Sequence, residues 1–430
     1  MRFISTRANV LAGGAEKTGN PATVSFEQAL TDCLPEDGGL YVPASAENLR
    51  NWILYTNSST SFTSIAGALT SALIREEFSP IISEAIAVNA FPFSPEIKRL
   101  DDSLFLLELF HGPSGSHIDF GVSYLLSCLE YCLLVQEKHA VVVGVSTGGL
   151  ASSLAYSLRG KKNIKALVLF PKGAVRGFEE SDCIGSGGSL FPVEVDGSLQ
   201  DCYNIARDLF GDRARVKRYG LTVANTSNIG RLLPYTFLYT YAFSRLKDTV
   251  YTDIFYALEA GTFGNLMAGL YAWKFSLPVN GFITNATPEL EINAHGKCEI
   301  AGTINTERFA DIFRANSHMV NALIFPAKVT DAETASAGRE LFSKYGVFAE
   351  KGAAVAYAAT KKVDSGESAK VIIARAHPSF HSDDLTLWCG KTPDKPENLQ
   401  NLQKSKKTLE KILPNLTNLI DCLEKICENK

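Results

Sequence analysis

Short, nearly continuous apolar runs alternate along the chain with amphipathic segments. The apolar runs are AVVVGVS (140–146), KALVLFP (165–171), LFPVEV (190–195), IFYALEA (254–260), FITNA (282–286) and VIIARA (371–376). Segments with helical spacing lie between them, namely LASSLAYSLRG (150–160), LQDCYNIARDLFG (199–211) and NLMAGLYAWKF (265–275). Apolar runs of this length are typical of strands covered on both faces. The alternation therefore predicts an α/β fold with parallel-type sheets, in which ligands lie at the carboxyl ends of the strands.

Composition narrows the class of protein without changing this picture. The chain has 430 residues, 46% hydrophobic and 20% charged, with a net charge of −4. These values are typical of a globular protein with about two or three domains, and they give no electrostatic reason to expect nucleic acid or a membrane as partner. The first residues, MRFISTRANVLAGGAEKTG, lack the apolar core of a signal peptide, and we expect no run that spans a bilayer. A cytoplasmic location is therefore expected.

Cysteine spacing gives no indication of a metal site. The chain has 9 cysteines, and none of them follow close metal-type spacing. Cys128 with Cys132, and Cys422 with Cys427, stand at helical spacings and are interpreted as buried thiols.

The loop Gly261-Thr262-Phe263-Gly264-Asn265 lies between a predicted strand and a predicted helix. Glycines allow the backbone to approach an anion closely, and the start of a helix attracts negative charge. The loop is therefore either a phosphate cradle or simply a tight turn. Glu259 would disfavour an anion if its side chain points inward.

A second loop, Gly144-Val145-Ser146-Thr147-Gly148, fits the G-x-S-x-G pattern of a nucleophile elbow. A hydrolase would also need an acid and a histidine, and the downstream candidates are His377, His381, Asp383 and Asp384. The same loop could instead cap a helix or bind an anion.

The segment HGPSGSHIDFG is a polar turn that leads into a predicted helix over 120–134. Asp119 is placed to cap this helix. His111 is either a ligand contact or a structural histidine.

Several motifs, in the same order along the chain, resemble those of the threonine synthase family. They are VSFEQALTDCLPEDGGLYVP (24–43), ELFHGPSGSHIDFG (108–121), GKKNIKALVLFPKG (160–173), CIGSGGSLFPVEVDGSLQDC (183–202), ANTSNIGRLLP (224–234), AGTFGN (260–265), GAAVAYAA (352–359) and ARAHPSF (374–380). ELFHGPSGSHIDFG is similar to the family signature ELFHGPTLAFKDFG. The resemblance implies the two-lobed pyridoxal phosphate (PLP) fold type II, like the tryptophan synthase β subunit.

The resemblance also implies a domain organisation. Residues 1–90 would form the N-terminal threonine-synthase-type domain and residues 91–390 the two lobes, with a small lobe at about 110–225. Beyond the resemblance, the sequence of residues 391–430 itself predicts a C-terminal helical tail, with a linker followed by one or two surface helices.

Five cofactor-facing positions depart from the family pattern. Ile118 stands where the family has the lysine that forms a Schiff base with PLP and moves protons on O-phosphohomoserine, a reaction that yields threonine and phosphate. Arg375 replaces a threonine that contacts the pyridine nitrogen. Ser146-Thr147-Gly148-Gly149-Leu150 lacks the family's polar side chain next to the ring, Thr262 replaces an asparagine and Gly352 replaces a histidine.

The other motif positions are kept, namely His111, Gly112, Pro113, Asp119, Asn225, Asn228, Arg231, Gly261, Phe263, Gly264, His377 and Pro378. Of these, His111, Asn225, Asn228 and Arg231 are candidates for binding a substrate phosphate. Isoleucine can neither form a Schiff base nor transfer a proton. We therefore predict a threonine synthase homologue that has lost PLP catalysis and holds a small phosphate-bearing anion non-covalently, at Gly261–Asn265, Ser146–Gly148 and Arg375.

Three alternatives remain open from the sequence. A lysine elsewhere, such as Lys172 or Lys351, could restore a PLP-dependent lyase. Ser146 could serve a hydrolase, or the chain could be a non-catalytic interaction subunit. The sequence does not predict the oligomeric state.

Overall fold

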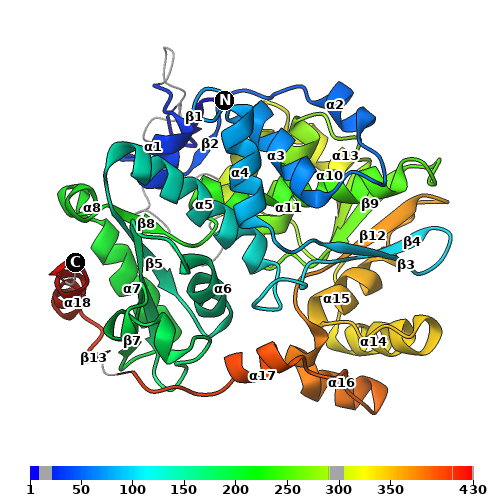
Figure 1. Cartoon of the computed structure of the whole chain (residues 1–430). Coiled ribbons are helices and arrows are strands. Elements are labelled where there is room, and N and C mark those ends of the chain that lie inside the picture. The colour runs from blue at the N-terminus through cyan, green and yellow to red at the C-terminus, as the bar shows by residue number, and fades with distance from the viewer. Residues whose placement is uncertain (9–21, 289, 291–304, 409, 429–430) are drawn as a thin grey trace.

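The computed structural model describes residues 1–8, 22–288, 290, 305–408 and 410–428. Most of the N-terminal stretch considered above for a signal peptide lies outside these residues. Figure 1 shows two lobes, each built around one sheet, with the N-terminal helices packed across the top of the view.

The larger sheet has the strand order β11 (Ile324–Pro326), β10 (Gly281–Thr284), β9 (Ile254–Leu258), β12 (Ala369–Ala374), β4 (Leu104–Glu108) and β3 (Glu96–Arg99). All neighbours are parallel except β3, which runs antiparallel to β4. The smaller sheet, entirely parallel, has the order β13 (Glu410–Ile412), β7 (Leu190–Val195), β6 (Ile164–Pro171), β5 (Ala140–Val145) and β8 (Leu221–Val223). The predicted α/β class with parallel-type sheets is thus confirmed.

The N-terminal region pairs β1 (Phe3–Ser5) with β2 (Tyr41–Pro43) in an antiparallel ribbon. Its helices are α1 (Phe26–Thr31), α2 (Arg50–Tyr55), α3 (Phe62–Leu73) and α4 (Pro80–Ala90). Serines at positions 25, 61 and 79 cap α1, α3 and α4 by accepting backbone N–H bonds, which explains why these helices begin where they do.

The remaining helices surround the two sheets. They are α5 (Ile118–Gln136), α6 (Gly149–Leu158), α7 (Leu199–Phe210), α8 (Arg213–Tyr219), α9 (Ile229–Leu232), α10 (Tyr235–Leu246), α11 (Gly264–Lys274), α12 (Asn305–Phe313), α13 (Val320–Leu323), α14 (Asp331–Tyr345), α15 (Lys351–Thr360), α16 (Ser382–Cys389), α17 (Glu397–Leu402) and α18 (Leu416–Glu428), with short 3-10 turns η1 (Glu180–Asp182), η2 (Ile184–Ser186), η3 (Ser317–Met319) and η4 (Pro378–His381).

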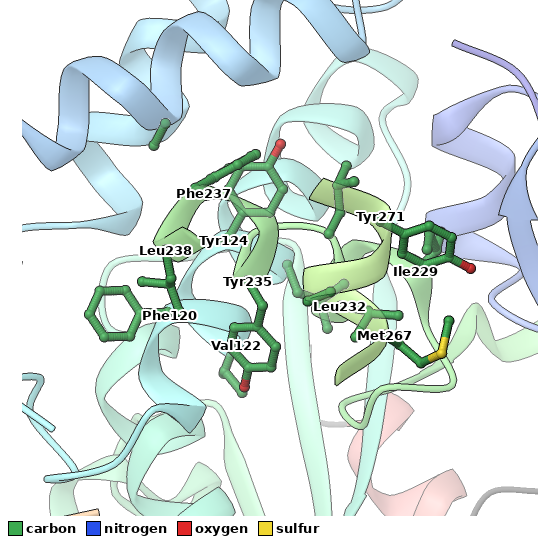
Figure 2. Close-up of a cluster of buried hydrophobic side chains, with 14 of the residues drawn as sticks. Phe120, Val122, Tyr124, Ile229, Leu232, Tyr235, Phe237, Leu238, Met267 and Tyr271 are labelled. Carbon is green, nitrogen blue, oxygen red and sulfur yellow. The ribbon is translucent and has the colours of Figure 1, made fainter. Parts of the chain in front are cut away.

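Helix α5 is central to the core. Phe120, Val122 and Tyr124 from α5 meet Tyr235 and Phe237 from α10 in a buried cluster (Figure 2), and the Tyr124 and Phe237 rings lie edge to face with centroids 5.5 Å apart. Contrary to expectation, α5 has the length and composition of a membrane span, with a mean hydropathy of 1.6. However, 72% of its apolar window is buried inside the fold, as in the core helix of a globular protein.

The segment after residue 391 contains two helices, α17 and α18, as predicted for a helical tail, and also a strand that was not predicted. Strand β13 pairs with β7 and extends the smaller sheet, and Leu419, Leu423 and Ile426 of α18 are buried in that lobe's core. Figure 1 shows α18 beside α7. The sequence did not predict this strand because β13 is only three residues long, too short for a periodic signal.

Candidate functional site

Ile118 is the first residue of α5 and follows the polar turn after β4. Its side chain packs against the apolar core. A Cβ built on Gly149 would lie 3.6 Å from the Ile118 Cδ1 atom. Ile118 therefore faces the start of α6, which is where the Ser146–Leu150 loop enters that helix.

The prediction that Asp119 caps α5 is wrong. The N-cap residue is His117, and Asp119 lies inside the first helical turn. The Asp119 carboxylate instead accepts the Ser114 N–H at 2.9 Å, and a Cβ on Gly112 would collide with it. Burial raises the pKa of Asp119 to about 6. The carboxylate thus fixes the shape of the HGP turn.

The Ser146 loop is held by its own backbone. The Ser146 hydroxyl oxygen accepts N–H bonds from Gly148 at 2.9 Å and from Ala151 at 3.1 Å, and the residue is only 3% exposed. Gly148 has φ 133°, a conformation that requires glycine. Arg176 donates to the Thr147 carbonyl at 2.7 Å. Ser146 therefore acts as a loop and helix-start anchor.

The histidines proposed as partners of Ser146 bond elsewhere. His377 Nδ1 lies 2.8 Å from the Ser379 hydroxyl, and His381 Nδ1 lies 3.7 Å from an Asp384 carboxylate oxygen. A nucleophilic serine needs a histidine within hydrogen-bond reach. The hydrolase interpretation has no geometric support.

The Gly261–Asn265 loop connects β9 to α11. Gly261 has φ 50° and Phe263 has φ 60°, so two residues of the loop adopt the left-handed conformation. Asn305 donates to the Thr262 carbonyl at 3.0 Å. Gly261 and Thr262 are exposed, whereas Phe263, Gly264 and Asn265 are buried. The loop is a tight turn whose outer part reaches solvent at the start of an 11-residue helix.

Arg375 is anchored at its backbone. The Arg375 N–H donates to a Glu350 carboxylate oxygen at 3.2 Å, and the Arg375 carbonyl accepts the His117 N–H at 2.7 Å. Glu350 is 4% exposed and also caps α15 by accepting the Gly352 and Ala353 N–H groups. Burial raises the pKa of Glu350.

The guanidinium of Arg375 forms an ion pair with Glu259, and the two side chains are only 20% and 30% exposed. Cβ atoms built on Gly261 and on Gly352 would each lie 2.8 Å from a guanidinium nitrogen, Nη1 and Nη2 respectively. Burial lowers the pKa of Arg375. Glu259, noted in the sequence as unfavourable for an anion, therefore lies beside the loop and neutralises the arginine predicted to bind one.

The asparagines of the ANTSN motif serve the fold. Asn228 is fully buried, donates to the Leu30 carbonyl at 2.9 Å and to the Thr222 hydroxyl at 3.0 Å, and caps α9 through the Gly230 N–H. Asn225 accepts the Ser227 N–H at 2.9 Å.

Arg231 is also largely inside the protein, at 4% exposure. It donates to the Tyr235 hydroxyl and lies 4.9 Å from the centroid of that ring. Tyr235 points away from α10 in Figure 2. A Cβ on Gly121 would collide with Arg231, so a glycine in α5 makes room for this side chain.

His111 follows β4 of the larger sheet. Its Nε2 atom is 3.0 Å from Glu108 and 3.7 Å from Glu96, and Lys98 donates to Glu108 at 2.8 Å. Burial raises the pKa of Glu108, but the hydrogen bonds from His111 and Lys98 outweigh burial and hold it below its usual value. A cavity of about 440 Å³ is lined by Glu108, His111 and His377.

Ligand atoms of Glu96, Glu108 and His111 lie within 4.8 Å of one another, a spacing that could hold a metal ion. The ammonium of Lys98 already supplies a positive charge to Glu108. Glu96, Glu108 and Lys98 could not be predicted from the sequence, since their contacts depend on the cross-strand pairing of β3 with β4.

Lys172 and Lys351, which the sequence offers as alternatives to the family lysine, lie at the surface. Lys172 is 73% exposed and pairs with Asp196 at 2.8 Å. Lys351 is 51% exposed and pairs with Asp331 at 3.6 Å.

Comparison with known proteins connects this geometry to a family. Residues 88–374 match the family model described as pyridoxal-phosphate dependent enzyme, and residues 2–88 match the model described as threonine synthase N terminus. Threonine synthase from Escherichia coli is 27% identical over 393 residues, covering 87% of this chain and 91% of that protein. Threonine synthase from Buchnera aphidicola subsp. Schizaphis graminum is 27% identical over 418 residues, covering 93% and 96%.

Solved structures agree on the fold. The crystal structure of E. coli threonine synthase has a TM-score of 0.80 at 24% identity and covers 100% of both chains. The PLP-bound threonine synthase from Brucella melitensis has a TM-score of 0.80 at 22% identity, covering 100% of this chain and 99% of that one. The chain belongs to the pyridoxal-phosphate-dependent enzymes of fold type II and, within them, to the threonine synthase family.

Proposed function

We propose that this chain is a threonine synthase homologue that does not carry out the PLP chemistry of its family, and that it binds a small phosphate-bearing ligand without a covalent bond. Ile118 is the observation that carries the proposal. Its alkyl side chain packs toward Gly149 and has no atom that can form a Schiff base or exchange a proton.

The residues present do not fit covalently held PLP. The family lysine position is apolar, and the position that contacts the pyridine nitrogen holds the guanidinium of Arg375, paired with Glu259. No step of the family reaction is therefore assigned to residues of this chain.

The alternative of a relocated lysine is less well supported. Lys172 and Lys351 are both at least half exposed and paired with carboxylates. Schiff-base chemistry requires an amine held at a fixed place next to the reacting carbon.

For a non-covalent ligand, the favoured region is the outer part of the Gly261–Asn265 loop. Gly261 and Thr262 are exposed and precede α11, whose N-terminal end carries a partial positive charge. The Arg375 guanidinium lies against Gly261 but is paired with Glu259, so the loop itself would hold the phosphate. The ligand is an anionic small molecule in this proposal, and the location is the cytoplasm.

The test is a PLP titration of the purified chain, followed by borohydride reduction and mass spectrometry of the adduct. E. coli threonine synthase is the positive control. We expect only scattered labelling of surface lysines. A stoichiometric adduct on one lysine, or threonine formation from O-phosphohomoserine, would refute the loss of PLP catalysis.

Ligand binding is tested separately by calorimetry with inorganic phosphate and with O-phosphohomoserine. We expect binding that is weakened by replacing Thr262 with glutamate, which adds a negative charge to the exposed part of the loop. If neither probe binds, or if the variant binds equally well, the ligand proposal fails and a non-catalytic interaction subunit becomes the better interpretation.

A further inference from the structure

Arg375 lies between two glycines that belong to different segments. One guanidinium nitrogen is 2.8 Å from the Cβ position of Gly261, in the loop after β9, and the other is 2.8 Å from the Cβ position of Gly352, at the start of α15. Real Cβ atoms do not approach other atoms so closely. The guanidinium therefore fills a space that exists only because both positions lack a side chain.

The arginine cannot easily leave this space. Its backbone is fixed on one side by Glu350 and on the other by His117, and residues 116 and 376 form an antiparallel bridge. Its tip is held by Glu259. Because the Arg375 side chain is restrained at both ends, a side chain at position 352 could be accommodated only if the Arg375–Glu259 ion pair were broken.

Position 352 shows why the two changes belong together. The resemblance gives a histidine at position 352 and a threonine at position 375. A Cβ at 352 would meet Arg375 at 2.8 Å and both Glu350 carboxylate oxygens at 3.0 Å. An arginine at 375 together with a histidine at 352 would therefore not fit.

We propose that Arg375, held by Glu259, is an internal occupant of the space in which the family holds the cofactor ring, and that Gly352 is the accompanying change that admits it. This inference is independent of Ile118. In this proposal the cofactor site lacks the lysine and is also occupied by the Arg375 side chain. Restoring the lysine alone therefore does not restore PLP binding.

The first experiment restores the lysine in two backgrounds of the full chain. The Ile118→Lys variant is incubated with PLP, reduced with borohydride and analysed by mass spectrometry, alongside Ile118→Lys/Arg375→Thr. A matched control, Ile118→Lys/Arg159→Thr, removes an arginine that pairs with Asp182 at 3.1 Å beyond the far end of α6. We expect labelling at position 118 only when Arg375 is removed. Stoichiometric labelling of the Ile118→Lys variant itself would overturn the proposal.

A second experiment needs no cofactor and still applies if the threonine variant loads PLP poorly. Gly352→Ala is made in the natural chain and in an Arg375→Thr background, and thermal unfolding is followed for the four proteins. We expect Gly352→Ala to lower the melting temperature in the natural chain and to lower it by clearly less when Arg375 is absent. Equal effects in the two backgrounds would overturn the proposal. A PLP adduct on the unmodified chain would instead contradict the loss of catalysis and leave this stability comparison unaffected.

Discussion

Replacing Glu259 by glutamine is expected to destabilise the large lobe, because the change leaves the Arg375 charge without its partner. Breaking a fully buried ion pair by removing one member costs about 3–5 kcal/mol, whereas exposed pairs contribute about 0–1 kcal/mol. The Arg375 and Glu259 side chains are 20% and 30% exposed, which is between these limits. Glutamine keeps the shape and one hydrogen-bond acceptor, so we expect a loss of about 2 kcal/mol.

The measurement is urea unfolding of the natural chain and of Glu259→Gln, followed by fluorescence, with the first transition compared between the two. Asp196→Asn is the matched control, because it removes the acidic partner of Lys172 from an exposed pair, and it is expected to change the midpoint little. If Glu259→Gln were no more destabilising than Asp196→Asn, the ion pair would not hold Arg375 in place. The inference that this arginine is a fixed occupant would then lose its support.

Three further predictions concern buried residues of the fold. Asn228→Ala removes two donated hydrogen bonds and a helix cap in the interior, so denaturant unfolding should show a loss of stability of about 3 kcal/mol. A loss as small as that of an exposed substitution would contradict the structural role of Asn228. Leu423→Ala in α18 opens a cavity in the smaller lobe and should cost about 2–5 kcal/mol; a neutral result would mean that α18 is not part of that core. The pKa of His117 is held well below its usual value by burial and by the Arg375 and Arg231 charges. Below about pH 6.5 the unfolded chain therefore binds a proton that the folded chain does not. As the pH is lowered through this range, the free energy of unfolding decreases by up to about 1.4 kcal/mol per pH unit. His117→Phe should remove this contribution, and an unchanged pH dependence in unfolding experiments would refute it.

The strands and main helices of the two lobes were predictable because their signals are local. The predicted run 165–171 is β6 (Ile164–Pro171), and the predicted run 190–195 is β7. That Ile118 stands at the family's lysine position remains a prediction, since it depends on one motif, ELFHGPSGSHIDFG. Local pattern was misleading at Asp119, because a carboxylate near a helix start can bond the preceding turn instead of capping the helix.

The partner of Arg375 could not be predicted, although Glu259 had been noted. Glu259 follows β9 and Arg375 follows β12, 116 residues later in the chain by their residue numbers. The two strands are neighbours in the larger sheet, so the loops at their carboxyl ends meet. Strand order is set by long-range packing, which periodicity within a segment does not encode.

Hydrogen bonds inside the protein explain why this chain keeps three of the family's polar residues. Asp119, Asn228 and Arg231 match the family motifs, and each bonds groups within the protein. Replacing one of them would leave buried polar groups unpaired, a cost that is independent of any cofactor. Ile118 and Gly352, in contrast, lie at positions where the resemblance implies contact with PLP. If PLP chemistry is lost, as we propose, only local packing constrains them. Asp119, Asn228 and Arg231 are therefore explained by the stability of the fold, and their presence does not argue for an active enzyme.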